Sequence, residues 1–312
     1  MGFYRKILRP SIIKSSQTTI WLMKIILPVS LLVGFLDFYG GLAYMAQFFN
    51  PLFIHLGLPG STAIVYITSI FLPLYAPLAI IMSMSMTLRE LTILALMCQT
   101  AHNLPVESAI QAKTGSSFWG MFSLRIVTSL AIGIVLNLIL PQDMGMPIFV
   151  KTSVEELSSV NDVFISWLTS SFQMAVILFT IISALNILYK LLLEYNLIAK
   201  LTKTIRPVLS FFGLPESVGF LWLIGYIVGL AYGGAMMIEQ LNDGKVTKSD
   251  VKLLNYHLAV SHSVLEDNLI FVALGVSYWL ILAVRLTFVW AIVWLAKLFI
   301  RLFSTKPQSI SI

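Results

Sequence analysis

Long apolar runs, separated by short polar connections, make up most of this 312-residue chain. They fall at about residues 20–48, 61–86, 89–111, 117–140, 163–193 and 216–241, with a further run around Arg285. A helix needs roughly 20 apolar residues to cross the hydrocarbon core of a bilayer. The pattern therefore predicts an all-α, polytopic membrane protein.

The second half of the pattern repeats the first. The turn LGLPG at 56–60 returns 156 positions later as FGLPE at 212–216. After a short insertion the offset becomes 160, and it then relates Thr87 to Thr247, Glu90 to Asp250, His102 to His262 and Arg125 to Arg285. An ordered series with one small gap indicates an internal duplication.

Composition supports the membrane prediction. Hydrophobic residues make up 58% of the chain and charged residues only 11%, and the mean hydropathy is +0.90. A soluble protein of this length needs far more charge on its surface. The formal net charge of +6 comes from basic residues in short connections, which is typical of membrane topology and not of a nucleic-acid groove.

The charged connections predict the orientation of the chain. Basic residues cluster at 5–14, 190–206, 245–252 and 297–306, whereas the 142–162 connection holds four acidic residues and one lysine. Because Lys and Arg are enriched in cytoplasmic loops, we expect both termini in the cytoplasm and 142–162 outside. Each half then crosses an odd number of times, so the halves are inverted-topology repeats, an architecture of many secondary transporters.

We divide the chain into five segments: a basic cytoplasmic leader (1–19), a first repeat (20–141), an acidic extracytoplasmic linker (142–162), a second repeat (163–303) and a cytoplasmic tail (304–312). Each repeat is expected to contain about three spans and one re-entrant helical hairpin.

The hairpin is predicted because basic residues flank the 216–241 run on both sides, so this run enters and leaves the membrane on one face. Residues that could break the helix there are Gly225, Gly229 and Gly233, with Pro73 and Pro77 in the first repeat. Broken backbone is tolerated at membrane depth where protein or a wet cavity surrounds it. The alternative is a straight span whose glycines allow close helix packing.

Two polar clusters interrupt otherwise apolar segments, at 99–107 and at 259–268. Ionisable groups at membrane depth are costly and usually pair inside the bundle or line a pathway. The candidate substrate- or ion-binding residues are His102, Asn103, Glu107, His262, Ser263, Glu266 and Asp267. Proton relay, cation coordination and hydrogen bonding to a substrate are all compatible with these residue types.

Two arginines, Arg125 and Arg285, lie in the last span of each half. We expect each to pair with a buried acid of its own half, Arg125 with Glu107 and Arg285 with Glu266 or Asp267, because adjacent helices joined by short loops pack together. The alternative is that the arginines contact an anionic substrate.

Metal binding is a weaker prediction. His102, His262 and Glu266 are potential ligands, and Glu107, Asp267 and Cys98 are further candidates. However, the sequence contains no short metal-binding spacing such as Cys-x-x-Cys or His-x-x-x-His.

The duplicated Gly-Leu-Pro turn, the broken hairpin and the Ser-His-Ser…Glu-Asp segment resemble the Gate, or nucleoside-recognition, domain family. Two such domains would cover roughly 20–140 and 163–300. Similar domains occur in the membrane part of the ferrous-iron transporter FeoB, in concentrative nucleoside transporters and in spore maturation proteins A and B. The resemblance implies a transport core with inverted repeats. It implies no particular substrate, since these relatives carry different cargo or none known.

We therefore expect a multi-pass inner-membrane transporter that moves a small polar solute or cation through a midplane site between the repeats. A divalent metal ion is the alternative substrate, and a non-transporting scaffold or assembly factor is the alternative function. The sequence shows no phosphate loop or nucleophile elbow, so we predict neither an enzyme nor a cofactor. The expected partners are the lipid bilayer and the substrate; a homodimer is left open, and nucleic acid is not expected.

Overall fold

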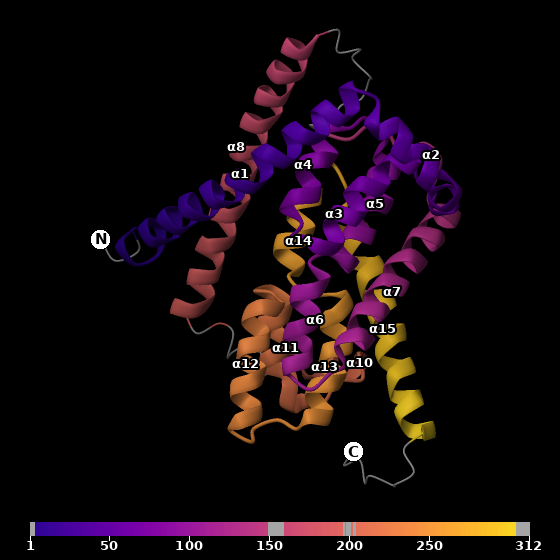
Figure 1. Ribbon diagram of the computed structural model, residues 1–312. Helices are drawn as coiled ribbons and strands as arrows, with labels where there is room; N and C mark the ends of the chain where they lie inside the picture. The colour runs from indigo at the N-terminus through magenta and orange to yellow at the C-terminus, as the bar shows by residue number, and fades with distance from the viewer. Residues whose placement is uncertain (1–3, 149–158, 196, 198–200, 202–203, 304–312) are drawn as a thin grey trace.

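The computed structural model describes residues 4–148, 159–195, 197, 201 and 204–303, which form helices joined by short turns and contain no β-strand. Figure 1 shows an elongated bundle in which most of the first half lies in the upper part and most of the second half in the lower part, although the second-half helix Val160–Glu194 extends to the upper end. Residues 149–158, the middle of the predicted acidic linker, and residues 304–312, the whole predicted tail, lie outside the described residues, as do Lys200 and Lys203.

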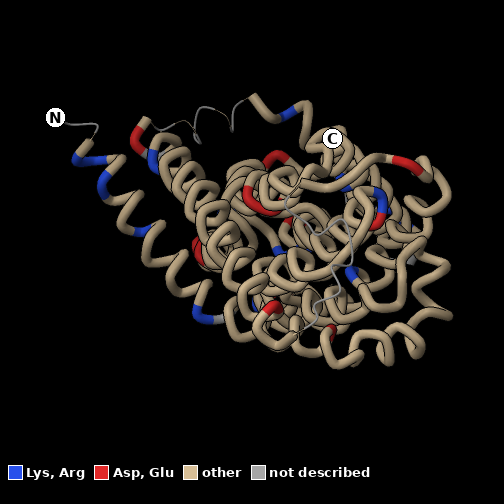
Figure 2. The backbone as a smooth tube through the Cα atoms, turned by 90° about the horizontal axis from the view of Figure 1, so that it is seen from above, with Lys and Arg blue, Asp and Glu red and all other residues tan. Residues whose placement is uncertain are grey.

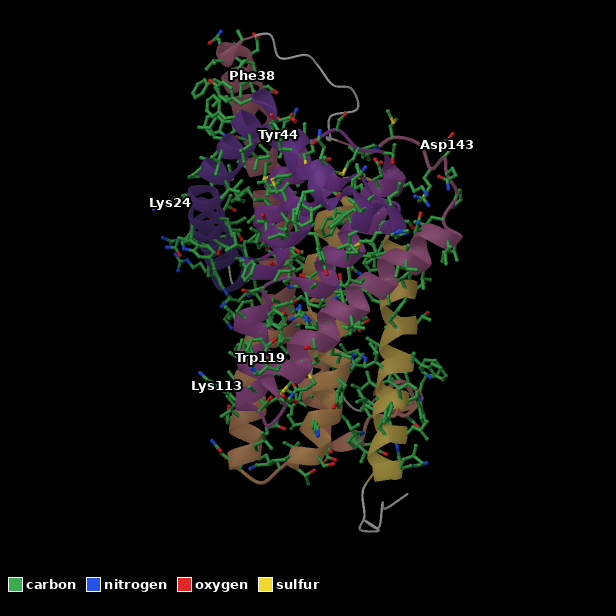
Figure 3. All side chains as sticks on the ribbon, turned by 45° about the vertical axis from the view of Figure 1, so that its right-hand side comes forward. Lys24, Phe38, Tyr44, Lys113, Trp119 and Asp143 are labelled. Atoms are coloured by element: carbon green, nitrogen blue, oxygen red, sulfur yellow. The ribbon has the colours of Figure 1, made fainter. Side chains whose placement is uncertain are left out.

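Among the described residues, four helices are long and apolar enough to cross a membrane: Tyr4–Phe38, Phe118–Ile139, Val160–Leu192 and Tyr278–Leu302. Large apolar side chains face outward from them, including Leu138 at 78% and Phe172 at 72% exposed, as a lipid environment favours. Tyr44 and Trp119 are exposed in the upper and the lower part of the bundle, respectively (Figure 3). These features confirm the predicted all-α polytopic membrane architecture.

Helices α1 (Arg9–Phe38) and α8 (Val160–Glu194) lie together at one side of the molecule (Figure 2). Asn186 Nδ2 donates to Ser15 Oγ at 3.0 Å, and Ser11 Oγ donates to the Asn186 carbonyl at 3.3 Å. The leader expected at 1–19 is not a separate segment, because the chain is helical from Tyr4 and runs directly into α1. Ile7, Ser11 and Ser15 are buried at a spacing of four residues, so this stretch has a packing face of its own.

Each half contains a helical hairpin. In the first, α3 (Ala63–Phe71) and α4 (Tyr75–Ser83) are separated by a short break that contains Pro73. In the second, α11 (Gly219–Ile227) and α12 (Leu230–Asn242) are separated by Val228 and Gly229, whose φ is +111°.

The breaker residues have different positions in these hairpins. Pro73 and Gly229 lie at the tips, whereas Pro77 lies in the first turn of α4. Gly225 and Gly233 lie within the two arms and face each other, because a Cβ on Gly233 would come 2.9 Å from the Gly225 Cα. The glycines thus allow the second hairpin to close tightly.

A broken helix follows each hairpin. The first consists of α5 (Leu88–Ala101) and α6 (Leu104–Lys113), and the second of α13 (Lys248–Val260) and α14 (Val264–Val272). Both begin with a capping box, at Thr87 and Thr247. Both breaks contain a residue in the left-handed conformation, Asn103 with φ +48° and Ser263 with φ +47°. The equivalent breaks therefore share a left-handed residue at the start of their second helix.

The two halves run in opposite directions. Helix α7 (Phe118–Ile139) rises from the lower end of the bundle, near Lys113, to the upper end, near Asp143 (Figure 3). Its equivalent, α15 (Tyr278–Phe303), descends to the lower end (Figure 1). The Gly-Leu-Pro turns that follow α2 (Gly41–Phe53) and α10 (Arg206–Phe211) also match, with left-handed Gly57 and Gly213 at φ +71° and +69°. The repeats therefore share one local fold and are inverted relative to each other.

Candidate functional site

The two helix breaks are held in place by the hairpins. The backbone N–H of Asn103 donates to the Ser69 carbonyl at 2.8 Å, and the N–H of Ser263 donates to the Gly225 carbonyl at 3.2 Å. Ser69 and Gly225 are themselves equivalent positions on the first arm of each hairpin. An interrupted helix inside a membrane must find partners for its free backbone groups. Each hairpin supplies one of them.

The arginines supply partners for the carbonyls at the same breaks. Arg125 and Arg285 are both fully buried. Arg125 Nη2 donates to the His102 carbonyl at 2.9 Å, and Arg285 Nη2 donates to the His262 carbonyl at 2.6 Å. Arg125 Nε also donates to the Thr100 carbonyl at 2.8 Å. The two guanidinium groups therefore have equivalent positions and stabilise equivalent stretches of backbone.

The acids at the equivalent positions, Glu107 and Asp267, make different contacts. Glu107 Oε2 accepts a hydrogen bond from Arg125 Nη1. Asp267 Oδ2 lies 3.6 Å from Arg285 Nη2, and Arg285 Nη1 instead donates to Asn268 Oδ1 at 2.8 Å. Each arginine thus lies beside an acid of its own half, and the acid beside Arg285 is Asp267, not Glu266.

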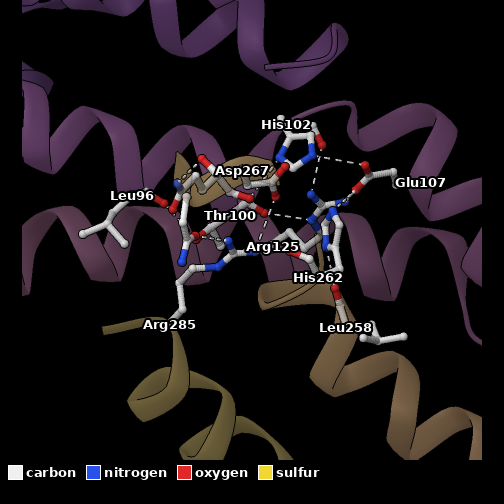
Figure 4. A network of polar contacts seen from close by, with 11 residues as sticks. Leu96, Thr100, His102, Glu107, Arg125, Leu258, His262, Asp267 and Arg285 are labelled. Carbon is white, nitrogen blue, oxygen red and sulfur yellow. Dashed lines mark hydrogen bonds and ion pairs between the residues drawn. The ribbon is translucent and has the colours of Figure 1, made fainter. Parts of the chain in front are cut away.

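The histidines of the two halves meet across the repeat interface (Figure 4). The ring centroids of His102 and His262 are 5.1 Å apart. His102 Nε2 lies 3.2 Å from Glu107 Oε1, and His262 Nε2 lies 3.3 Å from Glu107 Oε2. One carboxylate from the first half therefore faces a histidine from each half.

Glu266 lies apart from this cluster. Its carboxylate accepts a hydrogen bond from the Tyr75 hydroxyl, on the first hairpin. Glu266 and Tyr75 line a cavity of about 220 Å³ between the α1–α8 pair and the core, together with Lys14, Thr18, Asn186, Tyr189 and mainly aliphatic side chains. Of the predicted metal ligands, His102 and His262 come together with Glu107 in place of Glu266. Cys98 is buried but is not part of this group.

The remaining predicted residues, Asn103 and Ser263, determine the course of the main chain at the two breaks. Asn103 and Ser263 occupy the left-handed position at the start of α6 and α14. A side chain at Gly229 would collide with Ser263, since its Cβ would come 2.5 Å from Ser263 Oγ. The second break is therefore packed directly against the tip of its hairpin.

Several buried polar atoms near the breaks have no hydrogen-bond partner among the described residues: Gln99 Oε1, His262 Nε2, Asp267 Oδ2, Asn268 Nδ2 and Arg285 Nε. Such groups are uncommon in protein interiors because leaving them unpaired is costly. They belong to residues in or beside the two breaks and to Arg285, which binds the second break, and a polar ligand there could pair with them.

Sequence reasoning missed Tyr75, Lys14 and Asn186 in the cavity. Tyr75 is 191 residues from its partner Glu266, and no local pattern connects the two. Asn268 was detectable in principle, because it follows Asp267 directly inside the polar cluster.

The comparisons with known proteins agree with the membrane architecture. No family model matches the chain, and no solved structure matches it. The uncharacterized membrane protein YvoD of Bacillus subtilis is 29% identical to it over 287 residues, which cover 91% of each chain. The chain is thus a polytopic membrane protein, similar over nearly its whole length to a bacterial membrane protein.

Proposed function

We propose that this protein is a transporter that moves a small polar solute or cation through a site between its two inverted repeats. One observation carries the proposal: the broken helices of both halves meet at a single buried polar cluster. Non-helical backbone within a membrane is tolerated where it is enclosed by protein or lines a wet cavity, and transporters place their sites at such interruptions.

The cavity beside the cluster supports this proposal. It has a volume of about 220 Å³ and contains both a basic residue, Lys14, and an acidic one, Glu266. Glu266 lies on α14, in the same short helix as Asp267. A solute in the cavity would therefore lie next to the helix that carries half of the polar cluster.

The location and relationships of the chain are part of the proposal. Basic connections favour a cytoplasmic or inner membrane with both termini on the cytoplasmic side. The resemblance to Gate domains rests on the duplicated Gly-Leu-Pro turn, the broken hairpin and the Ser-His-Ser…Glu-Asp segment, and we propose membership of that family.

Transport can be tested with purified protein in proteoliposomes. A screen of thermal shifts with monovalent and divalent cations, nucleosides and amino acids would select ligands, and the flux of each stabilising ligand would then be measured. We expect His262→Ala to keep its fold and lose flux, whereas His55→Ala, a change at an exposed histidine outside the cluster, keeps both. Unchanged flux in folded His262→Ala would contradict the proposal.

The alternative function is a membrane scaffold or assembly factor. It is favoured by the arginines, which are fully buried and bind backbone carbonyls as purely structural groups would. On this alternative, variants in the cluster lose function only in proportion to their loss of stability, and no ligand in the screen shows flux with the wild-type protein.

A further inference from the structure

The cluster of His102, Glu107 and His262 has the geometry of a metal-binding site. One ligand atom from each residue lies within 4.8 Å of those of the other two. The contacts from the two Nε2 atoms to the carboxylate are 3.2 and 3.3 Å. Ligand atoms held about 2.0–2.2 Å from a tetrahedral ion lie roughly 3.3–3.6 Å from one another. The two contacts, one to each carboxylate oxygen, are close to this separation.

Backbone contacts orient both rings in the manner of metal-bound histidines. His102 Nδ1 lies 2.9 Å from the Gln99 carbonyl, and His262 Nδ1 lies 2.7 Å from the Leu258 carbonyl. A carbonyl can only accept, so each Nδ1 carries the hydrogen and donates it. In the neutral rings the lone pairs are therefore on the Nε2 atoms. Metal-ligating histidines usually donate their other ring N–H to a carbonyl or carboxylate in this way.

When the two rings are neutral, their Nε2 atoms cannot form hydrogen bonds with the group that they face. Both face the carboxylate of Glu107, so acceptors would face acceptors in a buried site. His262 is 1% exposed and its Nε2 has no hydrogen-bond partner among the described residues. A positive charge between the three groups would relieve this arrangement, and a metal ion has both the charge and the size to do so.

We propose that His102, Glu107 and His262 bind a divalent transition-metal ion such as Zn²⁺ through the two Nε2 atoms and the Glu107 carboxylate. Imidazole with carboxylate suits Zn²⁺ and its first-row neighbours, whereas Mg²⁺ and Ca²⁺ favour oxygen ligands alone. Three protein ligands leave a coordination position for water, which allows an ion to exchange, unlike a closed structural site. The role of the ion as cargo or coupling ion rests on the proposed transport function, but its binding does not.

Equilibrium binding to the full-length protein in detergent tests this site. After treatment with a chelator, Zn²⁺ would be titrated by calorimetry, and Co²⁺ by visible absorption, which reports coordination geometry. We expect one tight equivalent per chain. His102→Gln and His262→Gln should each weaken binding by at least about tenfold, because even the loss of an outer-shell partner of a ligand typically costs 10–100-fold. His55→Gln is the matched control and should bind as the wild type does.

Glu107→Gln leaves Arg125 without its acid and could unfold the protein, so Glu107→Asp serves as the second variant. Its shorter side chain keeps the charge but cannot reach both rings, and we expect weaker binding with retained thermal stability. The metal site is refuted if the folded wild-type protein binds neither Zn²⁺ nor Co²⁺ and its two histidines bind and release only protons. It is also refuted if both histidine variants bind as tightly as the wild type. Metal binding without any flux would support the metal site and contradict only the transport function. Flux of another solute without metal binding would support transport and contradict the metal site.

Discussion

The two helix breaks have nearly the same backbone and different side-chain chemistry. Both start from a capping box, both contain a left-handed residue, and both give a histidine carbonyl to a buried arginine. Yet Glu107 contacts Arg125 and both histidines, whereas its equivalent Asp267 stays 3.6 Å from Arg285. The two halves therefore share the arginines that bind the main chain at the breaks, and they differ in the contacts of the acids beside those arginines.

One methylene group is a large part of this difference. The longer side chain of Glu107 extends past its arginine to the centre of the repeat interface. Asp267 is shorter, and the neutral Asn268 takes up Arg285 Nη1 in its place. The residue equivalent to Glu266 in the first half is Val106, which is exposed, so only the second half contributes an acid to the cavity. The inverted repeats therefore make an asymmetric site.

The largest expected change in the free energy of unfolding comes from replacing the arginines, and it differs between the two. Arg125→Leu would leave the buried Glu107 carboxylate without its closest cation, and we expect it to lower the free energy of unfolding by roughly 3–5 kcal/mol. Arg285→Leu leaves Asn268, a carbonyl and the more distant Asp267 carboxylate, at 3.6 Å, without this partner, so we expect the smaller loss of about 1–3 kcal/mol. Thermal and denaturant unfolding in detergent would measure both.

The control is the double variant Arg125→Leu with Glu107→Gln. It removes the stranded charge and should be more stable than Arg125→Leu alone. A loss for Arg285→Leu equal to or greater than that for Arg125→Leu would show that the two ion pairs are equivalent after all.

An intermediate effect is expected in the hairpins. Gly233→Ala places a Cβ 2.9 Å from the Gly225 Cα, where backbone atoms must move apart, and overpacking of this kind costs roughly 1–3 kcal/mol. The matched control is Gly34→Ala in α1, whose Cβ would meet only a Val163 methyl at 3.5 Å and which should be neutral or slightly stabilising. The unfolding temperatures of the two variants would be measured and compared with that of the wild type. Equal behaviour would mean that the second hairpin does not depend on its close approach.

The smallest expected loss of stability comes from removing the helix caps that the two halves share. Thr87→Ala and Thr247→Ala each remove a capping box, and loss of such a cap costs about 1 kcal/mol. We expect similar losses of thermal stability for the two variants, and near-normal stability for Thr87→Ser and Thr247→Ser. Losses that differ by more than about twofold would indicate that the equivalent helix starts are not energetically equivalent.

Much of the local structure was predictable from the sequence. The offsets of 156 and 160 located the duplicated turns, and the polar interruptions at 99–107 and 259–268 marked both breaks. The hairpin tips contain two of the proposed breakers, Pro73 and Gly229. These features depend on the order of residues along one segment, where helix periodicity, glycine and proline act within a few positions.

By itself, the sequence determined that the chain is a membrane protein of two related halves, and which ionisable residues lie inside it. Only the tertiary structure decided which of those residues meet. Glu107, not Glu266, lies between His102 and His262, and Glu266 pairs with Tyr75 of the other half. The physical reason is that spacing along a helix sets the face on which a side chain lies, whereas contacts between halves depend on how far two inverted repeats slide past each other when they pack. One methylene separates Glu107, which reaches the histidines, from its equivalent Asp267, which does not. One position in the chain separates Asp267, beside Arg285, from Glu266, which lines the cavity.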